Sequence, residues 1–300
     1  MAKTYVRIIK ELHWHQKPSI RLQDDLSPYI SIERGVRREC VLSPYLFNIY
    51  TEFIFRESND LQGICIHGMN VNNLRYADDT ALIADDPQKL QEIVNKVKAE
   101  SSRAGLDMNV KKTKTMIISR HPGEKKLEIN VDGVILEMVD IFKYLGTLIK
   151  DNGKIESELE ARTKLAKSQF SAMSKTFTSK RLKMKTKIRI LKCYIFSIFT
   201  YGSEAWSLSK VLEQKIEAME MWCYRWMGNI SWKDKITNAN VLLKLGTKRT
   251  LLKDVQKRKL RYYGHIKRKN NILTTALEGR MSGKRPRGHP RINRFNNINE

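Results

Sequence analysis

The sequence has no long apolar run and little negative charge to balance its positive charge. A membrane-spanning helix needs about 18 or more consecutive apolar residues, and no such run occurs. The first residues, MAKTYVRIIKELHWHQ, hold no apolar core followed by a small-residue cleavage site, so we expect no signal peptide. These absences predict a nuclear or cytoplasmic protein that is neither secreted nor bound to a membrane.

Cysteine is scarce and scattered. The four cysteines are Cys40, Cys65, Cys193 and Cys223, and no two of them form a C-x-x-C pair. Zinc sites and disulfide frameworks both show regular or close cysteine spacing, so neither is expected. The histidines show no ligand spacing either. Free thiols in a reducing compartment fit this pattern.

Positive charge is present in excess. The chain carries 56 Lys and Arg against 32 Asp and Glu, a formal net charge of +24. A basic surface attracts polyanions, and nucleic acid is the commonest such partner, with an anionic membrane surface as the alternative. Hydrophobic residues make up 41% of the chain, which suits a substantial core. The length suits roughly one to three domains.

Strand and helix signals alternate up to about residue 150. Helices are expected over 4–16, from Ser43-Pro44 onward with Ser43 as N-cap, and over 87–104, ended by Gly105. Strands are expected over 19–22 and 29–32 as a hairpin whose turn is 23–28, in short pieces within 64–86, over 116–118 and over 141–145. This mixture predicts an α+β fold.

After about residue 153 the pattern becomes helical. Apolar residues recur at helical spacing from Ile155 to Phe177, and further helices are expected over 184–200, 208–227 and 248–268. Four tryptophans are expected to pack this half: Trp206, Trp222, Trp226 and Trp232. We predict domains at 1–150 and 151–278, and a basic disordered tail at 279–300.

Two adjacent acids interrupt an apolar run at Tyr76-Ala77-Asp78-Asp79. Neighbouring carboxylates repel each other, so they either sit at an exposed turn or bind a hard cation. As a bare dipeptide, Asp-Asp is usually a solvated turn. Set between two apolar half-strands, it equally suits Mg²⁺, and two such ions about 4 Å apart can clamp the oxygens of phosphoryl transfer.

Upstream motifs decide between these interpretations. The stretch from Arg34 to Asn48, RGVRRECVLSPYLFN, resembles the R-G-V-R-Q-G-x-x-L-S-P-x-L-F-N signature of non-LTR (LINE-type) retrotransposon reverse transcriptases. Gly105 to Thr113 resembles the next palm motif, and Phe142 to Gly146 resembles the primer-grip motif. Downstream, YGSEAW from Tyr201 and MWCYRWM from Met221 resemble later parts of the same element-encoded proteins.

The resemblance implies an RNA-directed DNA polymerase, a nucleotidyltransferase. Its fold would be an incomplete right-hand palm followed by an all-α thumb and C-terminal helical region. Its partners would be an RNA template and a DNA primer, or an RNA–DNA hybrid, with deoxynucleotides if it is active. Asp78 matches the essential metal ligand and Asp79 its weaker companion, for Mg²⁺ or Mn²⁺ if the site is completed.

Other family roles match single positions. Lys112 matches the lysine near the leaving pyrophosphate, although a solvated lysine in a basic cluster is the plainer interpretation. Arg37 matches an arginine near the incoming nucleotide, and Tyr76 belongs to the same substrate side. Phe142, Tyr144 and Gly146 would position the primer strand; a buried strand with its turn glycine explains them equally well.

The chain departs from the family pattern in two places. The F-x-K-A-F-D motif that supplies the third carboxylate is absent, so Met1 is expected to open a truncated reading frame without an endonuclease. Arg38-Glu39 stands where the family has Gln-Gly, which puts a negative side chain beside a triphosphate site. We therefore expect no polymerisation by the isolated chain.

The alternative is a non-catalytic nucleic-acid-binding remnant. From Lys248 to Arg294 the chain has 16 Lys and Arg against 2 Asp and Glu, with Tyr262 and Tyr263 among them. Cations meet phosphates and aromatic rings can stack on bases. A solvated helix whose tyrosines belong to the core is the competing interpretation.

Overall fold

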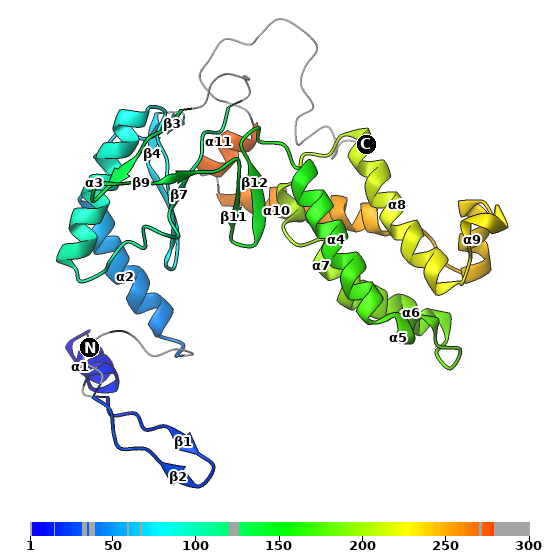
Figure 1. Cartoon of the computed structure of the whole chain (residues 1–300), viewed down its shortest axis with the longest axis horizontal. Helices are drawn as coiled ribbons and strands as arrows, with labels where there is room; N and C mark the ends of the chain where they lie inside the picture. Colours follow the sequence, from blue (N-terminus) through cyan, green and yellow to red (C-terminus); the bar gives the residue numbers. More distant parts are fainter. Residues whose placement is uncertain are drawn as a thin grey trace, which may run out of the picture. The chain divides into compact units, whose positions relative to one another are not determined.

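The protein is described by a computed structural model covering residues 2–14, 16–31, 35, 40–58, 60–66, 68–119, 126–269 and 272–278. Helices and short two-stranded sheets are combined, so the expected α+β character is confirmed (Figure 1). The chain divides into two compact units. The first unit is Met1–Ile64 with Val71–Asn109, and the second is Cys65–Asn70 with Val110–Glu300. The domain limits expected at 150 and 278 stay a prediction.

The first unit begins with a helix and a small hairpin. Helix α1 spans Ala2–His13, so the helix expected over 4–16 is present but begins and ends earlier, and strands β1 (Arg21–Leu22) and β2 (Asp25–Leu26) pair in antiparallel. The long turn predicted over 23–28 was wrong, because Gln23 has a φ of 55° and closes the hairpin within two residues. Tyr29 and Ile30 are therefore not strand, although the Ile30 N–H still donates to the Pro18 carbonyl at 2.9 Å.

Two helices form the core of the first unit. Helix α2 spans Ser43–Arg56 and α3 spans Pro87–Arg103. Their buried residues Ile54, Phe55, Ile93 and Val97 make one cluster. The Asp86 side chain accepts the Gln88 N–H at 2.7 Å and caps α3, and Gly105 follows the helix with a φ of 71°, as predicted.

The start of α2 differs from the prediction. The N-cap is Leu42 in helical conformation, not Ser43. Because Ser43 already lies inside the helix, its hydroxyl is not in the capping position, and this buried oxygen has no hydrogen-bond partner among the described residues. The proline expected in the first turn is Pro44, and that part of the prediction is confirmed.

Four short strands follow α2. They are β3 (Ile64–Ile66), β4 (Met69–Val71), β5 (Asn73–Tyr76) and β6 (Asp79–Leu82), paired as β3 with β4 and β5 with β6. Gly63 lets the chain pass close to the start of β5. A Cβ atom there would lie 2.2 Å from the Val71 carbonyl oxygen, which is backbone and cannot rotate away.

Gly63→Ala is therefore expected to lower the stability of the first unit by about 1–3 kcal/mol, the cost of inserting a methyl group into packed structure. Urea denaturation followed by circular dichroism would measure it. Gly264→Ala is the matched control, since the nearest atom to its new Cβ is an arginine nitrogen at 3.5 Å and the site is helical. An equal effect of both substitutions would contradict the packing argument.

The strands of the second unit form three pairs. Strand β7 (Lys114–Thr115) runs parallel to β10 (Glu137–Met138), whereas β8 (Asn130–Val131) pairs with β9 (Val134–Ile135) and β11 (Ile141–Tyr144) with β12 (Thr147–Lys150) in antiparallel. The strand predicted over 116–118 was displaced by two residues. The ladder with β10 ends at Thr115. Beyond it, Met116 and Ile117 are partly buried without strand pairing, and Ile118 is exposed.

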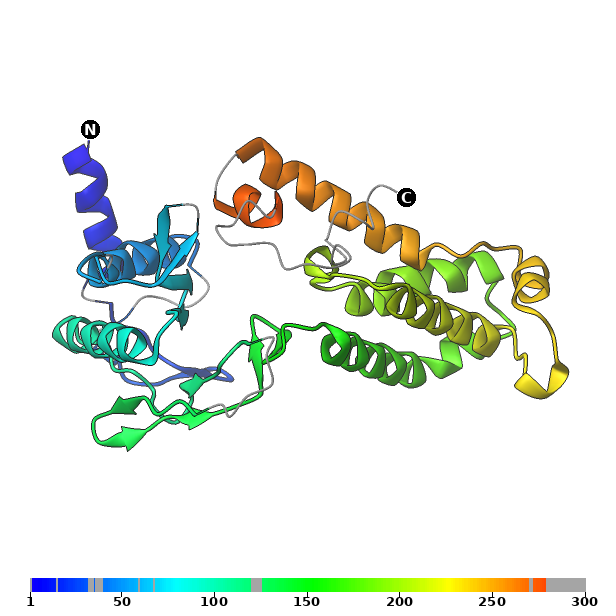
Figure 2. The same ribbon diagram turned by 90° about the horizontal axis from the view of Figure 1, so that it is seen from above.

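The rest of the second unit is helical. Its helices are α4 (Glu156–Ala172), α5 (Ser174–Thr178), α6 (Met184–Ile190), the π-helix η1 (Leu191–Phe196), α7 (Ser197–Phe199), η2 (Ser203–Ala205), α8 (Lys210–Met227), η3 (Trp232–Asp234), α9 (Asn238–Leu245), α10 (Leu251–Lys269) and α11 (Ile272–Glu278). Helix α8 packs against both α4 and α10 (Figure 2). No helix in the described part of the chain is long and apolar enough to cross a membrane.

One large core holds these helices together. Phe170 and Phe177 stack at 4.4 Å between ring centroids, and Phe199 meets Trp206 edge to face at 5.9 Å. Trp206 is buried as predicted and Trp222 packs against the core. Trp226 also packs on Phe170 although it is 51% exposed, and the prediction was wrong only for Trp232, which is 81% exposed. Trp226 retains one face on the aromatic cluster, whereas Trp232 lies on a 3₁₀ turn outside it.

Candidate active site

The Tyr76–Asp79 motif forms the tip of the β5–β6 hairpin. Tyr76 pairs with Asp79 across the ladder, which leaves Ala77 and Asp78 as a two-residue loop. Ala77 has a positive φ of 51°, whereas the φ of Asp78 is not positive. Hairpin loops with a positive φ at the first position alone normally have glycine there. The backbone at this tip is therefore held in a conformation that alanine adopts only under constraint.

Both carboxylates of the tip are exposed. Tyr76 is 66% exposed, and Asp78 and Asp79 are also open to solvent. At the other end of the hairpin, Leu82 packs against the α2–α3 core. Solvent reaches the two adjacent charges, which is the condition under which they can lie side by side at small cost.

Two side chains fix the hairpin to α2 and its following loop. The Arg75 guanidinium donates to Glu52 at 2.6 Å and lies 4.8 Å from the centre of the Phe55 ring. The Asn72 amide, which is buried, donates to the carbonyls of Ser58 at 2.7 Å and Leu61 at 2.9 Å. The carboxylate tip thus extends from a base with charged and buried polar anchors.

The upstream motif is only partly visible. Arg37, predicted beside the nucleotide, and the departure at Arg38-Glu39 lie outside the described residues. Gly35 has a φ of 101°. From Cys40 onward the motif lies among the described residues, and it continues into α2.

The remaining predicted residues belong to the second unit. Lys112 is exposed in the turn that precedes β7. Phe142 and Tyr144 lie half-buried on β11, and Tyr144 pairs with Thr147 on β12. Leu145 and Gly146 close this hairpin with φ of 47° and 79°, the double positive φ of a type I′ turn.

A group of three side chains, here named the turn clamp, holds that hairpin: Glu158, Arg162 and Tyr201. The Glu158 carboxylate accepts the Leu148 N–H at 2.7 Å and the Arg162 Nε–H at 2.6 Å. Arg162 also donates to the Gly146 carbonyl, and its guanidinium lies 4.6 Å from the centre of the Tyr201 ring.

Tyr201 completes the turn clamp from the other side. Its hydroxyl donates to the Leu145 carbonyl at 2.9 Å, and its ring would lie 3.5 Å from a Cβ atom at Gly146. Glu158 and Arg162 are 2% and 8% exposed, so their ion pair is inside the protein. The turn carbonyls of Leu145 and Gly146 are both occupied by clamp donors, which fixes the hairpin against α4.

Comparison with known proteins identifies the first half of the chain. Residues 5–149 match the family described as reverse transcriptase (RNA-dependent DNA polymerase). This part of the chain is therefore a reverse transcriptase domain. The match includes the Tyr76–Asp79 tip and the β11–β12 turn, and it ends before the turn clamp begins.

The relatives show where this reverse transcriptase domain comes from. A transposon-derived protein of Caenorhabditis elegans is 27% identical over 217 residues, covering 71% of this chain and 77% of that protein. The Pol polyprotein of the type-1 retrotransposable element R2 of Nasonia vitripennis is 28% identical over 140 residues, 44% of this chain. The type-2 element R2DM polyprotein of Drosophila melanogaster is 28% identical over 130 residues, 41% of this chain. The chain is of retrotransposon origin.

The two R2 polyproteins are much longer than this chain. The chain spans 14% of the Nasonia polyprotein and 12% of the Drosophila one. By family, the domain is that of RNA-directed DNA polymerases.

The structure groups the predicted residues of the reverse transcriptase domain in two sets. Tyr76, Asp78 and Asp79 share one hairpin tip in the first unit, and Phe142, Tyr144 and Gly146 share another hairpin in the second. Sequence reasoning did not predict roles for the turn-clamp residues Glu158, Arg162 and Tyr201. The one available signal was the resemblance that begins at Tyr201, which carried no role for that residue.

Reverse transcriptases use divalent metal ions, so we asked whether the carboxylate tip could hold them. Asp78 and Asp79 offer oxygens of the kind Mg²⁺ accepts beside water and phosphate. Across the residues that the structure describes, no group of three or more His, Cys, Asp or Glu side chains could hold a metal ion. Two neighbouring carboxylates do not supply the ligands of a two-metal centre. The described residues therefore do not fit a complete catalytic metal site.

Proposed function

We propose that this chain carries the nucleotide-side turn of a reverse transcriptase palm and binds an RNA template with a DNA primer, or an RNA–DNA hybrid, without polymerising by itself. The observation that carries this is the carboxylate tip, with Asp78 and Asp79 exposed on a constrained turn and no third carboxylate beside them among the described residues. The family match supports the choice of reaction class.

The roles of the residues follow from this proposal. Asp78 and Asp79 contribute oxygens to Mg²⁺ or Mn²⁺ when another carboxylate completes the site, and that ion would stabilise charge on phosphate oxygens. Lys112 and Arg37 act on the phosphates of pyrophosphate and nucleotide, Tyr76 lies on the substrate side, and the hairpin of Phe142, Tyr144 and Gly146 positions the primer. Incoming deoxynucleotides are substrates only of the completed site.

Primer extension tests the catalytic half of the proposal. With an RNA template, a DNA primer, deoxynucleotides and either Mg²⁺ or Mn²⁺, we expect the purified 300-residue chain to incorporate no more nucleotide than its Asp78→Asn variant. The physical reason is that two carboxylates leave one part of the metal pair without ligands. Incorporation by the wild type that the Asp78→Asn variant lacks would overturn the proposal.

A non-catalytic nucleic-acid-binding protein is the second candidate. Two observations favour it: the described residues hold no group of three metal-ligand side chains, and the net charge is +24. Hybrid binding distinguishes the two. Binding that is unchanged by chelating Mg²⁺ and by replacing Asp78 and Asp79 with asparagine supports the second candidate. Binding that needs both the ion and the carboxylates supports a palm that still holds its substrate through metal.

A further inference from the structure

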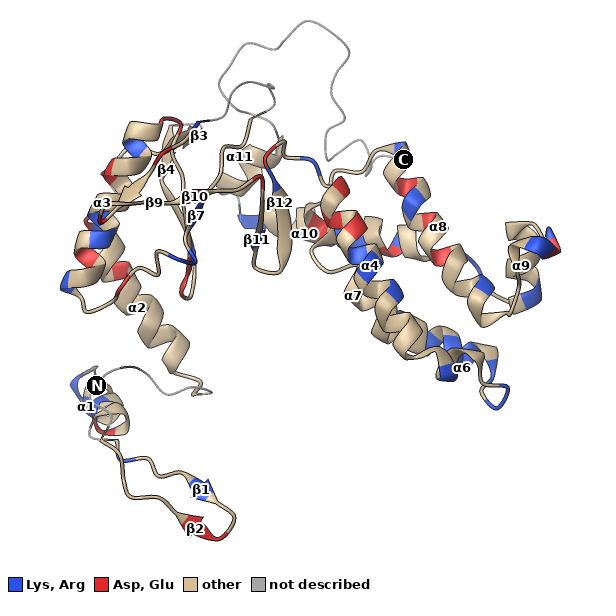
Figure 3. Cartoon of the chain, in the orientation of Figure 1, with Lys and Arg blue, Asp and Glu red and all other residues tan. Residues whose placement is uncertain are grey.

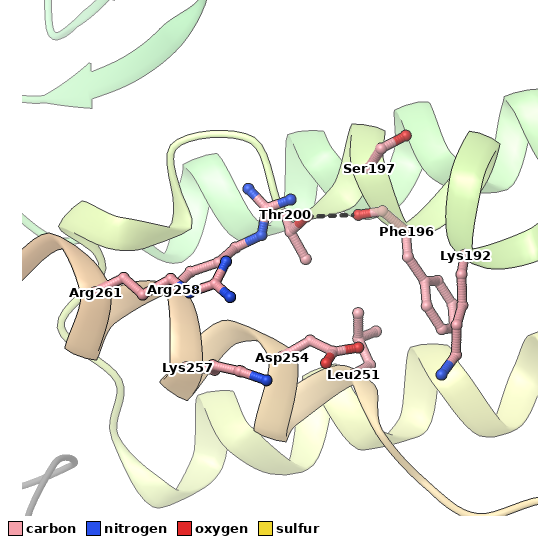
Figure 4. A pocket seen from close by; sticks show the side chains of 9 residues that line it. All are labelled: Lys192, Phe196, Ser197, Thr200, Leu251, Asp254, Lys257, Arg258 and Arg261. Atoms are coloured by element: carbon pink, nitrogen blue, oxygen red, sulfur yellow. Dashed lines mark hydrogen bonds between the residues drawn. The ribbon is translucent and has the colours of Figure 1, made fainter.

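A groove opens in the second unit between the first half of α10 and the helices facing it. Its cavity volume is about 280 Å³. The residues that line it are Lys192, Phe196, Ser197, Thr200, Leu251, Asp254, Lys257, Arg258 and Arg261. Figure 4 shows the α10 side chains of Lys257 and Arg258 on one wall, and Lys192 with Phe196 on the other.

The floor of the groove belongs to the core. Phe196, Thr200 and Leu251 are all buried, and the Thr200 hydroxyl is already used by the Phe196 carbonyl at 2.7 Å. The start of α10 is fixed by the buried Glu220 carboxylate, which accepts the Thr250 N–H at 2.8 Å and the Leu251 N–H at 3.1 Å. The polar atoms at the floor and at the start of α10 already have partners within the protein, so the side chains of the rim are what the groove offers a ligand.

The rim is cationic. Four of its side chains are basic and one, Asp254, is acidic. Arg258 is partly neutralised by Glu204 at 3.2 Å. Within the described part of the chain, no ion pair involves Lys192, Lys257 or Arg261, and all three are exposed. Their charges are thus available to an anion that enters from solvent.

The cations continue beyond the groove as a line. Lys185 and Arg189 of α6 are exposed and precede Lys192, which lines the groove, by seven and three residues, spacings that place side chains on one side of a helix. Figure 3 shows Lys and Arg in blue along α6. Seven residues of helix rise about 10 Å. A nucleic-acid strand carries one phosphate per about 3.4 Å of duplex axis, so this line spans roughly three phosphates.

We propose that this groove and the line of cations leading into it bind the phosphodiester backbone of a nucleic-acid duplex. A line of separate cations suits a chain of phosphates better than a single small anion. The aromatic ring at the floor is buried and cannot stack on a base, so the contact is to phosphates and independent of sequence. A membrane surface would need exposed apolar residues beside the cations, whereas the apolar lining residues Phe196 and Leu251 are buried.

This inference rests on the proposed function for the choice of a nucleic acid and does not require polymerisation. The test uses the full chain and a fluorescently labelled RNA–DNA hybrid, with binding measured by anisotropy between 50 and 300 mM salt in the presence of a chelator. The groove variant is the double substitution Lys257→Gln with Arg261→Gln. The control is Lys164→Gln with Lys244→Gln, which removes the same charge at exposed helical positions outside the groove.

The groove variant is expected to reduce the slope of log affinity against log salt by about 2, because each lost phosphate contact accounts for about 0.9. At 0.15 M salt this corresponds to an affinity loss on the order of thirtyfold. The control is expected to bind within about threefold of wild type. Asp254→Asn, which removes the one acid of the rim, is expected to bind the hybrid more tightly.

The outcomes separate the two proposals. If the wild-type chain binds no hybrid, both fail. If it binds the hybrid and the groove variant loses no more affinity than the control, only the groove proposal fails. Vesicles containing anionic lipid form a further arm: a groove variant that loses vesicle binding but keeps hybrid binding would assign the groove to a membrane surface and overturn the proposal.

Discussion

Replacing Arg162 by methionine is expected to lower the free energy of unfolding of the second unit by about 3–5 kcal/mol. Methionine fills a similar volume but carries no charge. It therefore leaves the Glu158 carboxylate, 2% exposed, without its partner at 2.6 Å. It also removes the donor to the Gly146 carbonyl and the cation on the Tyr201 ring. Urea denaturation followed by tryptophan fluorescence measures the change, since Trp206 lies in the core of this unit and Trp222 packs against that core.

Arg249→Met is the matched control for this substitution. Arg249 and Glu217 are also 2.6 Å apart, but their side chains are 43% and 37% exposed. Water solvates both partners of such a pair, so its loss should cost less than about 1 kcal/mol. An Arg162→Met effect no larger than that of Arg249→Met would show that the buried ion pair does not hold the hairpin.

A second variant separates charge from packing. In Glu158→Gln with Arg162→Met, the glutamine oxygen still accepts the Leu148 N–H while the unpaired negative charge is gone. We expect this double variant to be more stable than Arg162→Met alone, because an uncompensated buried charge is the largest part of the penalty. If it is less stable, the Glu158 carboxylate accepts the Leu148 N–H so much better than the glutamine oxygen does that this outweighs the cost of the unpaired buried charge.

The turn clamp also shows how far the sequence alone could reach. The two hairpin turns were predictable because their determinants are local: Tyr76 to Asp79 and Phe142 to Gly146 each carry their signal within five residues. The turn clamp was not predictable, because Arg162 and Tyr201 lie 16 and 56 residues along the chain from the Gly146 and Leu145 carbonyls that they bind. An acid and an arginine four residues apart on α4 are usually a solvated pair. Their burial follows from the hairpin packed over them, which no periodicity reveals.

The errors of the sequence prediction also come from tertiary packing that local sequence does not reveal. Serine is a residue type that favours the N-cap, but Leu42 takes that position and already has helical backbone angles. The Ser43 hydroxyl is buried instead. Residues 184–200 were predicted as one helix from their apolar spacing, yet Leu191–Phe196 is π-helical. A π segment shifts the side chains that follow it by about one position. Phe196 ends the π segment and Thr200 follows it, and both line the groove.

Glu220→Ala is expected to destabilise the second unit by about 3–5 kcal/mol. Glu220 is fully buried on α8, and besides the two N–H groups at the start of α10 it accepts the Tyr224 hydroxyl at 2.9 Å. Alanine leaves these donors buried without an acceptor, and each costs about 1–3 kcal/mol. Glu217→Ala, one turn earlier on the same helix and with a side chain 37% exposed, is the control and should cost less than about 1 kcal/mol.

The pH dependence of Glu220 gives a sharper test than its removal. Burial raises the pKa of the Glu220 carboxyl above its usual value, and the N–H and hydroxyl donors only partly oppose this. A group whose pKa is higher in the folded than in the unfolded state contributes stability that is complete below its unfolded pKa and is lost as pH rises through the folded pKa. The wild type should therefore lose stability relative to Glu220→Gln as pH rises above the ordinary glutamate range.

This difference is measured by urea denaturation of both proteins from pH 4 to pH 8, so that all other titrating groups cancel. Glutamine keeps one oxygen for the N–H groups of Thr250 and Leu251 but cannot titrate. If the wild type instead gains stability over Glu220→Gln with rising pH, the donors at the start of α10 hold the carboxylate more strongly than burial opposes it. The charge of Glu220 would then be what fixes α10, and with it the basic wall of the groove, at neutral pH.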